Sequence, residues 1–213
     1  MALFKYGEAK WCDKLAQVGG LRVGTLHDFR RDEHKRGIAD PSEGTKSVHY
    51  GVDAQVFTGG TEQAKAFGEA FGFKFGPGVQ LSIKGCAFNR QVDSEDFFIY
   101  CLASRFSGAV LREFEGADAC VRITHVRRFC DAITHALESR VAVEFIGAHR
   151  VIYTPRHETW NGVDLGKHPA LVKEPSFAPQ CEVRALWRPT GGAPICAEVF
   201  ESSDAHQFCE RIL

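Results

Sequence analysis

A nearly unbroken apolar run, DFFIYCLAS at residues 96–104, constrains the fold of this chain more than any other feature. A strand with one solvated face alternates apolar and polar residues, whereas a strand buried on both faces is apolar throughout. The segment 126–138 instead places apolar residues on one stripe of a helix: Val126, Phe129, Cys130, Ile133 and Leu137. We therefore expect a central strand over 97–104 with the helix 126–138 packed on it.

The rest of the chain predicts more strands than helices. Further strands are expected at residues 3–6, 21–26, 47–57, 78–92, 119–123, 140–146, 149–154, 180–188 and 194–200, with helices at 8–18, at 61–73 and close to the C-terminus. Regular strand–helix–strand units are few, and no glycine-rich phosphate-binding loop of the dinucleotide or Walker type occurs. The sequence predicts one α+β domain over residues 1–213, with a bent, mostly antiparallel sheet and three to four helices.

Two irregular segments are long enough to serve a site. Residues 27–46 are strongly charged, and residues 154–179 contain several Gly and Pro. Long loops in compact domains are often functional. We interpret the second segment as a functional loop or flap.

Composition excludes several classes of protein. Of 213 residues, 44% are hydrophobic and 17 are Phe, which suits a buried core and excludes disorder as the main state. The net charge of −1 gives no broad basic field for nucleic acid or an anionic membrane. No apolar run approaches the ~20 residues that span a bilayer, and the first residues lack the apolar segment of a secretory signal. We expect a cytoplasmic protein with no membrane partner.

The eight cysteines are scattered, and most lie in apolar or alternating runs: Cys12, Cys86, Cys101, Cys120, Cys130, Cys181, Cys196 and Cys209. Cysteine in such runs behaves as a small buried hydrophobe. No Cys-x-x-Cys pair and no His-x-x-x-His pair supplies the start of a zinc site. We expect reduced, mostly buried thiols and no metal.

The segment Gln180–Trp187, QCEVRALW, is the most informative for chemistry. On a strand, Cys181, Val183, Ala185 and Trp187 share one apolar face. Gln180, Glu182 and Arg184 then stand together on the opposite face. Three neighbouring polar side chains on a core strand predict either a solvent-facing strand with a weak Glu–Arg pair or a functional surface.

A second group of polar residues lies near the N-terminus and at the end of the apolar run. Lys5 and Tyr6 precede the first helix and could bind a phosphate or stack on a base, and Arg22 and Thr25 lie on the next strand. Ser104 ends the central strand, where sheets often place ligands or begin loops. The histidines at positions 27, 34 and 49 lie in polar surroundings and are interpreted as surface residues.

The order of these motifs resembles that of ADP-ribosyltransferase toxins of the Gln-x-Glu class. The chain has a first strand FKY, a central strand ending in serine, FFIYCLAS, and a late QCEVR strand. It also resembles a bacterial and phage family that begins with Lys-Tyr, carries an LRVGTLxDFR-like segment and ends with a Lys…Glu-x-Arg strand. Two departures stand out: Lys5 replaces the expected Arg or His unless Arg22 takes that role, and only Ser104 of Leu102-Ala103-Ser104 matches a Ser-Thr-Ser element.

The resemblance implies a split sheet, NAD as cofactor and transfer of ADP-ribose to a macromolecule, protein or nucleic acid, or to water. Glu182 would then bind the nicotinamide ribose and Gln180 would orient the acceptor. Arg184 or Lys5 would hold the pyrophosphate, and Tyr6 or Tyr100 would pack on nicotinamide. Arg22, Thr25 and Ser104 complete the implied cofactor contacts. The setting implied is bacterial or phage toxicity or defence.

Two alternatives remain open at this point. One is a cysteine nucleophile, Cys181 or Cys101, with a distant His, although apolar surroundings raise a thiol pKa. The other is a non-catalytic nucleotide- or protein-binding module, a sensor or immunity component, that makes its contacts through residues 27–46.

Overall fold

The computed structural model describes residues 2–31 and 33–213, and these fall into two compact units. The first unit comprises the chain up to Glu43, Glu95–Tyr153 and Lys173–Leu213. The second comprises Gly44–Ser94 and Thr154–Val172. The expectation of a single domain stays a prediction, because two compact units of one chain can unfold together or separately.

The first unit is built on a sheet of eight strands, and all of their described pairings are antiparallel. Its strands are β1 (Leu3–Gly7), β2 (Gly20–Thr25), β5 (Phe98–Ala103), β6 (Ala119–Ile123), β7 (Val143–Arg150), β11 (Glu182–Pro189), β12 (Glu198–Glu201) and β13 (Cys209–Arg211). The order is β12-β2-β5-β1-β6-β13, with β11 pairing both β5 and β7. The predicted α+β class with a mostly antiparallel sheet is confirmed.

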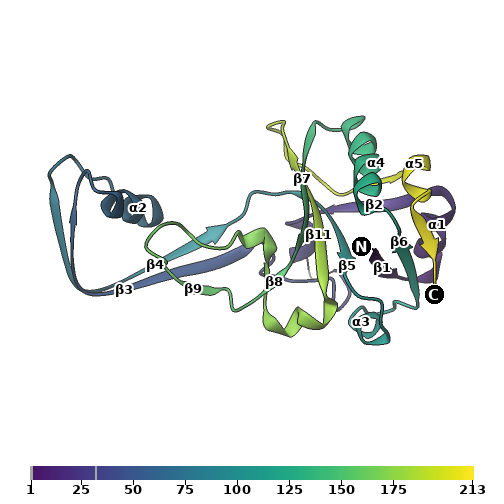
Figure 1. Cartoon of the computed structure of the whole chain (residues 1–213), viewed down its shortest axis with the longest axis horizontal. Coiled ribbons are helices and arrows are strands. Elements are labelled where there is room, and N and C mark those ends of the chain that lie inside the picture. The colour runs from purple at the N-terminus through teal and green to yellow at the C-terminus, as the bar shows by residue number, and fades with distance from the viewer. Residues whose placement is uncertain (1, 32) are drawn as a thin grey trace. The chain divides into compact units, whose positions relative to one another are not determined.

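Strand β5 is the centre of this sheet, as its apolar run predicts. One edge pairs with β11 along the whole strand, from Glu182 opposite Ala103 to Trp187 opposite Phe98. The other edge is divided, because β1 pairs at Ala103 and β2 pairs at Ile99. The strands β1 and β2 therefore part from one another beside the middle of β5. Figure 1 shows β5 and β11 side by side in the first unit.

Helix α4 (Val126–Glu138) packs on the sheet through the stripe read from the sequence. Phe129, Ile133 and Leu137 are fully buried in the same core cluster as residues of β5 and β11. The rings of Tyr100 and Phe129 lie 5.6 Å apart, and Trp187 Nε1 donates a hydrogen bond to Thr134 Oγ1 at 2.7 Å. The predicted packing of this helix on the central strand is confirmed.

The other helices of the first unit are α1 (Ala9–Val18), α3 (Gly108–Arg112), α5 (Ser203–His206) and the 3-10 turns η1 (Asp28–Arg30) and η3 (Pro175–Gln180). Helix α1 ends where predicted, with Gly19 in the left-handed region at φ 68°. Ser202 lies against Gly19 so closely that an added Cβ would collide with it. Within the described residues, no helix is long and apolar enough to cross a membrane.

The second unit consists of a long hairpin covered by a helix. Strands β3 (Thr45–Thr58) and β4 (Gln80–Asp93) are antiparallel, and β9 (His157–Thr159) pairs with β3 in parallel. Helix α2 (Glu62–Phe71) begins at Thr61, whose side chain caps Ala64 N. An aromatic cluster fills this unit, with Phe57 and Phe67 stacked at 4.1 Å. The turn η2 (Pro169–Leu171) also belongs here, and β8 (Ile152–Tyr153) and β10 (Val172–Lys173) lie where the chain passes between units.

Some expected strand boundaries differ in the structure. Gln180 ends the turn η3 rather than starting a strand, because Cys181 takes a left-handed conformation at φ 49° and β11 begins after it. A single strand β7 replaces most of the two strands expected at 140–146 and 149–154. Its pairing with β11 shifts register by one residue, because consecutive Leu186 and Trp187 face Gly147 and Phe145, so the extra residue is Ile146 of β7.

All eight cysteines are free thiols in the structure. Cys12, Cys120 and Cys130 are buried, and Cys101, Cys181 and Cys209 are partly buried. Cys86 and Cys196 are exposed, which corrects the expectation of burial for these two. Cys86 lies on β4, whose side chains are mostly solvated because the hairpin buries little of that strand.

Candidate functional site

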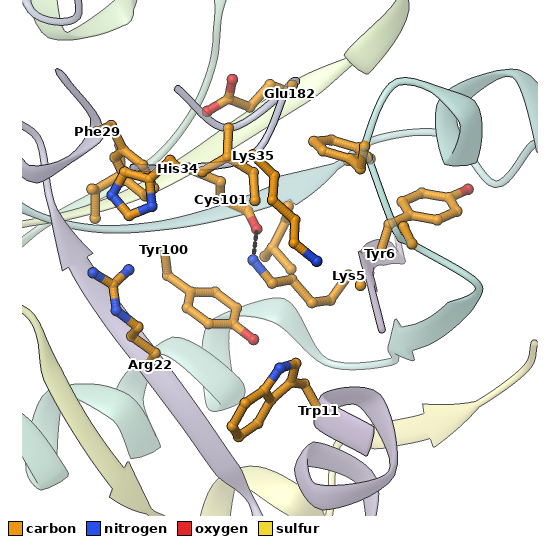
Figure 2. A pocket seen from close by; sticks show the side chains of 18 of the residues that line it. Lys5, Tyr6, Trp11, Arg22, Phe29, His34, Lys35, Tyr100, Cys101 and Glu182 are labelled. Atoms are coloured by element: carbon orange, nitrogen blue, oxygen red, sulfur yellow. Dashed lines mark hydrogen bonds between the residues drawn. The ribbon is translucent and has the colours of Figure 1, made fainter. Parts of the chain in front are cut away.

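A cavity of about 480 Å³ opens in the first unit where β1 and β2 part beside β5. Its volume lies within the usual range for small-molecule sites. The charged segment predicted to be a functional loop forms part of its wall, through Phe29, Glu33, His34, Lys35, Gly37, Ile38 and Glu43. Figure 2 shows the side chains that converge on this space.

Glu182 lies in the wall of this cavity, 5% exposed, between two cations. Lys173 Nζ donates to its Oε2 at 2.8 Å and Arg184 Nε donates to its Oε1 at 2.8 Å. Burial by itself would raise the pKa of Glu182, but the charges and hydrogen bonds of Arg184 and Lys173 hold it well below its usual range. The structure therefore keeps an ionised carboxylate in a nearly dry place.

Arg184 is committed to a second carboxylate. Its Nη1 and Nη2 donate to the two oxygens of Glu43 at 2.7 Å each, in the bidentate geometry that Arg forms with carboxylates. Arg184 is 1% exposed and Glu43 is 1% exposed. The nitrogens of the guanidinium therefore donate to Glu43 and Glu182 within the protein. The expectation that Arg184 holds a pyrophosphate does not fit this geometry.

Gln180 lies beside this network although it is not on the strand. Its Oε1 accepts from Lys173 Nζ at 3.2 Å, and its Nε2 donates to the Gly37 carbonyl at 2.8 Å. The three polar residues 180, 182 and 184 are thus brought together and line the cavity, as expected. Gln180 positions Lys173 and the loop at Gly37, and its amide is already bonded at both ends.

Lys5 presents a cation to the cavity without an acidic partner among the described residues. Its Nζ donates to the Cys101 carbonyl at 3.0 Å and lies 4.6 Å from the centroid of the Tyr100 ring. Burial lowers the pKa of Lys5 from its ordinary value. Figure 2 shows Lys5 at the middle of the cavity, with Glu182 on one side and Trp11 on the other.

Arg22, His34 and Arg31 surround one carboxylate, that of Asp28. Arg22 Nη2 forms an ion pair with it, His34 Nε2 lies 3.4 Å from Oδ2 and Arg31 Nη1 lies 3.5 Å from Oδ1. Three basic side chains thus share the single carboxylate of Asp28. His34 is partly buried and lines the cavity, which corrects its interpretation as a surface residue.

Three other expected contacts lie apart from the cavity or are engaged elsewhere. Ser104 donates to the Cys181 carbonyl at 3.0 Å and is not a lining residue. Thr25 is buried, and its hydroxyl accepts from Asp28 N at 3.2 Å. Tyr6 lines the cavity, but its hydroxyl accepts from Ser107 N at 2.8 Å and donates to the Arg105 carbonyl at 3.0 Å.

Cys101, one of the two candidate nucleophiles, lies in surroundings that disfavour a thiolate. Burial raises the pKa of Cys101 to about 12, so its thiol stays protonated near neutral pH. No group of three or more His, Cys, Asp or Glu side chains within residues 2–31 and 33–213 is arranged to hold a metal ion.

Three residues of the site were missed by sequence reasoning: Glu43, Lys173 and Trp11. Lys173 matches the Lys of the Lys…Glu-x-Arg pattern, so that pattern could have singled it out. Glu43 is one acid in a charged loop, and nothing in its neighbourhood distinguishes it. Trp11 resembles a core position on its helix, yet it is 58% exposed.

No family model, curated protein or solved structure gives a significant match to this chain. An ionised carboxylate, a cation without an acidic partner and aromatic rings line one cavity. This set suits a ligand that carries a phosphate, a flat ring and a centre that gains positive charge.

Proposed function

We propose that the cavity binds NAD and that the protein transfers ADP-ribose to a macromolecular acceptor, protein or nucleic acid, or to water. The observation that carries this proposal is Glu182, a carboxylate kept ionised in the cavity wall across from Lys5. The divided edge of β5 also agrees with the split sheet that the resemblance to ADP-ribosyltransferases implies.

The reaction breaks the bond between the ribose C1′ and the nicotinamide nitrogen. The bonding electron pair leaves with nicotinamide, and positive charge grows on the ribose as in glycoside cleavage. An acceptor oxygen or nitrogen then bonds to C1′ and loses its proton. A fixed negative charge at the ribose stabilises the transition state more than the ground state, and Glu182 would supply it.

The remaining roles follow from which side chains are already engaged. Lys5 would bind the pyrophosphate, since Arg184 is paired with Glu43 and Glu182. Tyr100, beneath Lys5, would pack against the ligand. Gln180 would position Lys173 rather than contact the acceptor directly.

A second candidate is a non-catalytic nucleotide-binding module. The observation that favours it is that both oxygens of Glu182 already accept hydrogen bonds from cations of the protein. A carboxylate so paired has less charge to offer a ribose. In that case the ionic network holds the loop at Gly37 and Glu43, and the cavity binds a ligand without cleaving it.

The test is titration calorimetry with NAD, followed by measurement of nicotinamide release. Glu182→Gln should leave NAD binding largely intact and lower the rate roughly 100- to 1000-fold. Glu43→Gln is the matched control, because it also removes a negatively charged partner of Arg184. Equal losses in both variants would assign the effect to the network. Binding without release by the wild type would favour the non-catalytic module.

The biological setting is part of the same proposal: a bacterial or phage toxin or defence protein that works in the cytoplasm. Induced expression of an active transferase should slow growth, and Glu182→Gln should relieve the effect. A binding module should be harmless in both forms. Labelled NAD in a cell lysate would identify the acceptor.

A further inference from the structure

Trp11 is a large aromatic side chain that the fold leaves unpacked at the cavity. It lies on α1, where Cys12 and Leu15 face the core, and it is 58% exposed while lining the cavity. Its one described contact with another side chain is Lys10, whose Nζ lies 5.2 Å from the ring centroid. An indole has two faces, so this contact leaves one face for a ligand.

The Tyr100 hydroxyl gives a second, independent observation. Tyr100 is 3% exposed, and no residue of the described chain forms a hydrogen bond with its hydroxyl. Figure 2 shows that hydroxyl directed toward Trp11. Burial raises the pKa of Tyr100 well above its ordinary value, so the group remains a donor. Tyr100 lines the cavity, so this donor without a protein partner is available to a ligand there.

Lys5 lies between these groups and the carboxylate. In Figure 2, Glu182 and Trp11 lie on opposite sides of Lys5. The cavity therefore offers, in order, an anion, a cation beside a hydroxyl donor, and an open aromatic face. A dinucleotide has the matching order of a ribose that gains positive charge, a pyrophosphate, and an adenine ring.

We infer that the Trp11 end of the cavity is an adenylate subsite, with the adenine stacked on Trp11 and its phosphate bound by Lys5 Nζ and the Tyr100 hydroxyl. The inference rests on the proposed function in taking a dinucleotide as the whole ligand. It adds the orientation of that ligand, with the nicotinamide ribose toward Glu182. It also implies that AMP alone binds this part of the cavity.

The experiment compares NAD, AMP and nicotinamide mononucleotide by calorimetry with the wild type, Trp11→Ala and Trp11→Phe. Loss of a base-stacking ring typically weakens binding about 5- to 150-fold. We expect Trp11→Ala to weaken AMP and NAD by about tenfold or more and to leave nicotinamide mononucleotide within about threefold. Trp11→Phe keeps a ring and should retain most of the affinity. Since Trp11 is exposed, neither variant should disturb folding, which thermal melting checks.

The outcomes separate this inference from the proposed function. The adenylate subsite would be overturned if Trp11→Ala left AMP and NAD affinity unchanged, or if it weakened nicotinamide mononucleotide by an equal factor. Neither result would contradict the proposed transfer of ADP-ribose. AMP binding that depends on Trp11, without nicotinamide release from NAD, would support the subsite and reject the transferase. A wild type that binds neither AMP nor NAD would reject both.

Discussion

Glu43 and Arg184, 141 positions apart in the sequence, are joined by two parallel hydrogen bonds of 2.7 Å. This pair links the charged segment 27–46 to the beginning of strand β11. Removing one member of a buried ion pair typically costs about 3–5 kcal/mol, because the other charge stays buried without compensation. We expect Glu43→Gln to lower the free energy of unfolding by about this amount in urea melts.

Glu33→Gln is the control for this prediction. Glu33 belongs to the same loop and lines the same cavity, but it is exposed. Its substitution should change the free energy of unfolding by less than about 0.5 kcal/mol. Similar small effects in both variants would show that the Glu43–Arg184 pair contributes little to stability.

The same network predicts how stability depends on pH. The pKa of Glu182 is lowered in the folded protein relative to its ordinary value of 4.5. A lowered carboxyl pKa stabilises the fold above the unfolded-state pKa, and that contribution is lost as pH falls below about 4.5. Urea melts from neutral pH to about 3 should show this decline, and Glu182→Gln should make it shallower. An identical slope in the variant would contradict the role given to Glu182.

Sequence patterns predicted the elements whose signal is local. The apolar run of β5 and the stripe of α4 each lie within one segment, so their burial could be predicted without knowing the rest of the fold. The end of α1 at Gly19 was equally local. The alternation in β11 also placed Glu182 and Arg184 on the face opposite Val183 and Trp187.

What could not be predicted depends on distant partners or on unusual backbone geometry. The left-handed conformation of Cys181 is one that few residues other than Gly, Asn or Asp adopt, so a strand was expected to begin too early. The short strand β13 has three residues and forms because β6 offers a free edge. Glu43 meets Arg184 only after the loop has closed, and no spacing rule relates the two positions.

Ile133→Ala tests the packing of α4 on the sheet. Ile133 is fully buried in the core cluster, and truncating such a residue typically costs about 2–5 kcal/mol through lost transfer energy and the cavity left behind. Arg128→Ala, on the exposed side of the same helix, should change stability by less than about 0.5 kcal/mol. Denaturant melts measure both. A loss below about 0.5 kcal/mol for Ile133→Ala would mean that this face of α4 does not carry the core.

Lys5 leads to a prediction in which stability and binding respond differently. Its ammonium is partly buried and has no acidic partner among the described residues, so the charge itself is a cost to the fold. Lys5→Met keeps much of the side-chain length and removes that charge. We expect stability to change by less than about 1 kcal/mol, because the lost hydrogen bond to Cys101 offsets the relieved burial. We expect binding of AMP and NAD to fall about tenfold or more, since a charge-assisted contact to phosphate is lost.

Lys14→Met supplies the matched control for Lys5, and pH gives an independent check. Lys14 also lines the cavity, but it is partly exposed and paired with Glu201 at 3.0 Å, so its loss should alter AMP affinity by less than about threefold. Because burial lowers the pKa of Lys5, AMP affinity should decline with rising pH before ordinary lysines, with a pKa of 10.5, lose their protons. Calorimetry over an alkaline pH series measures this decline, and Lys5→Met should not show it. Equal affinity in Lys5→Met and wild type would remove Lys5 from the phosphate site.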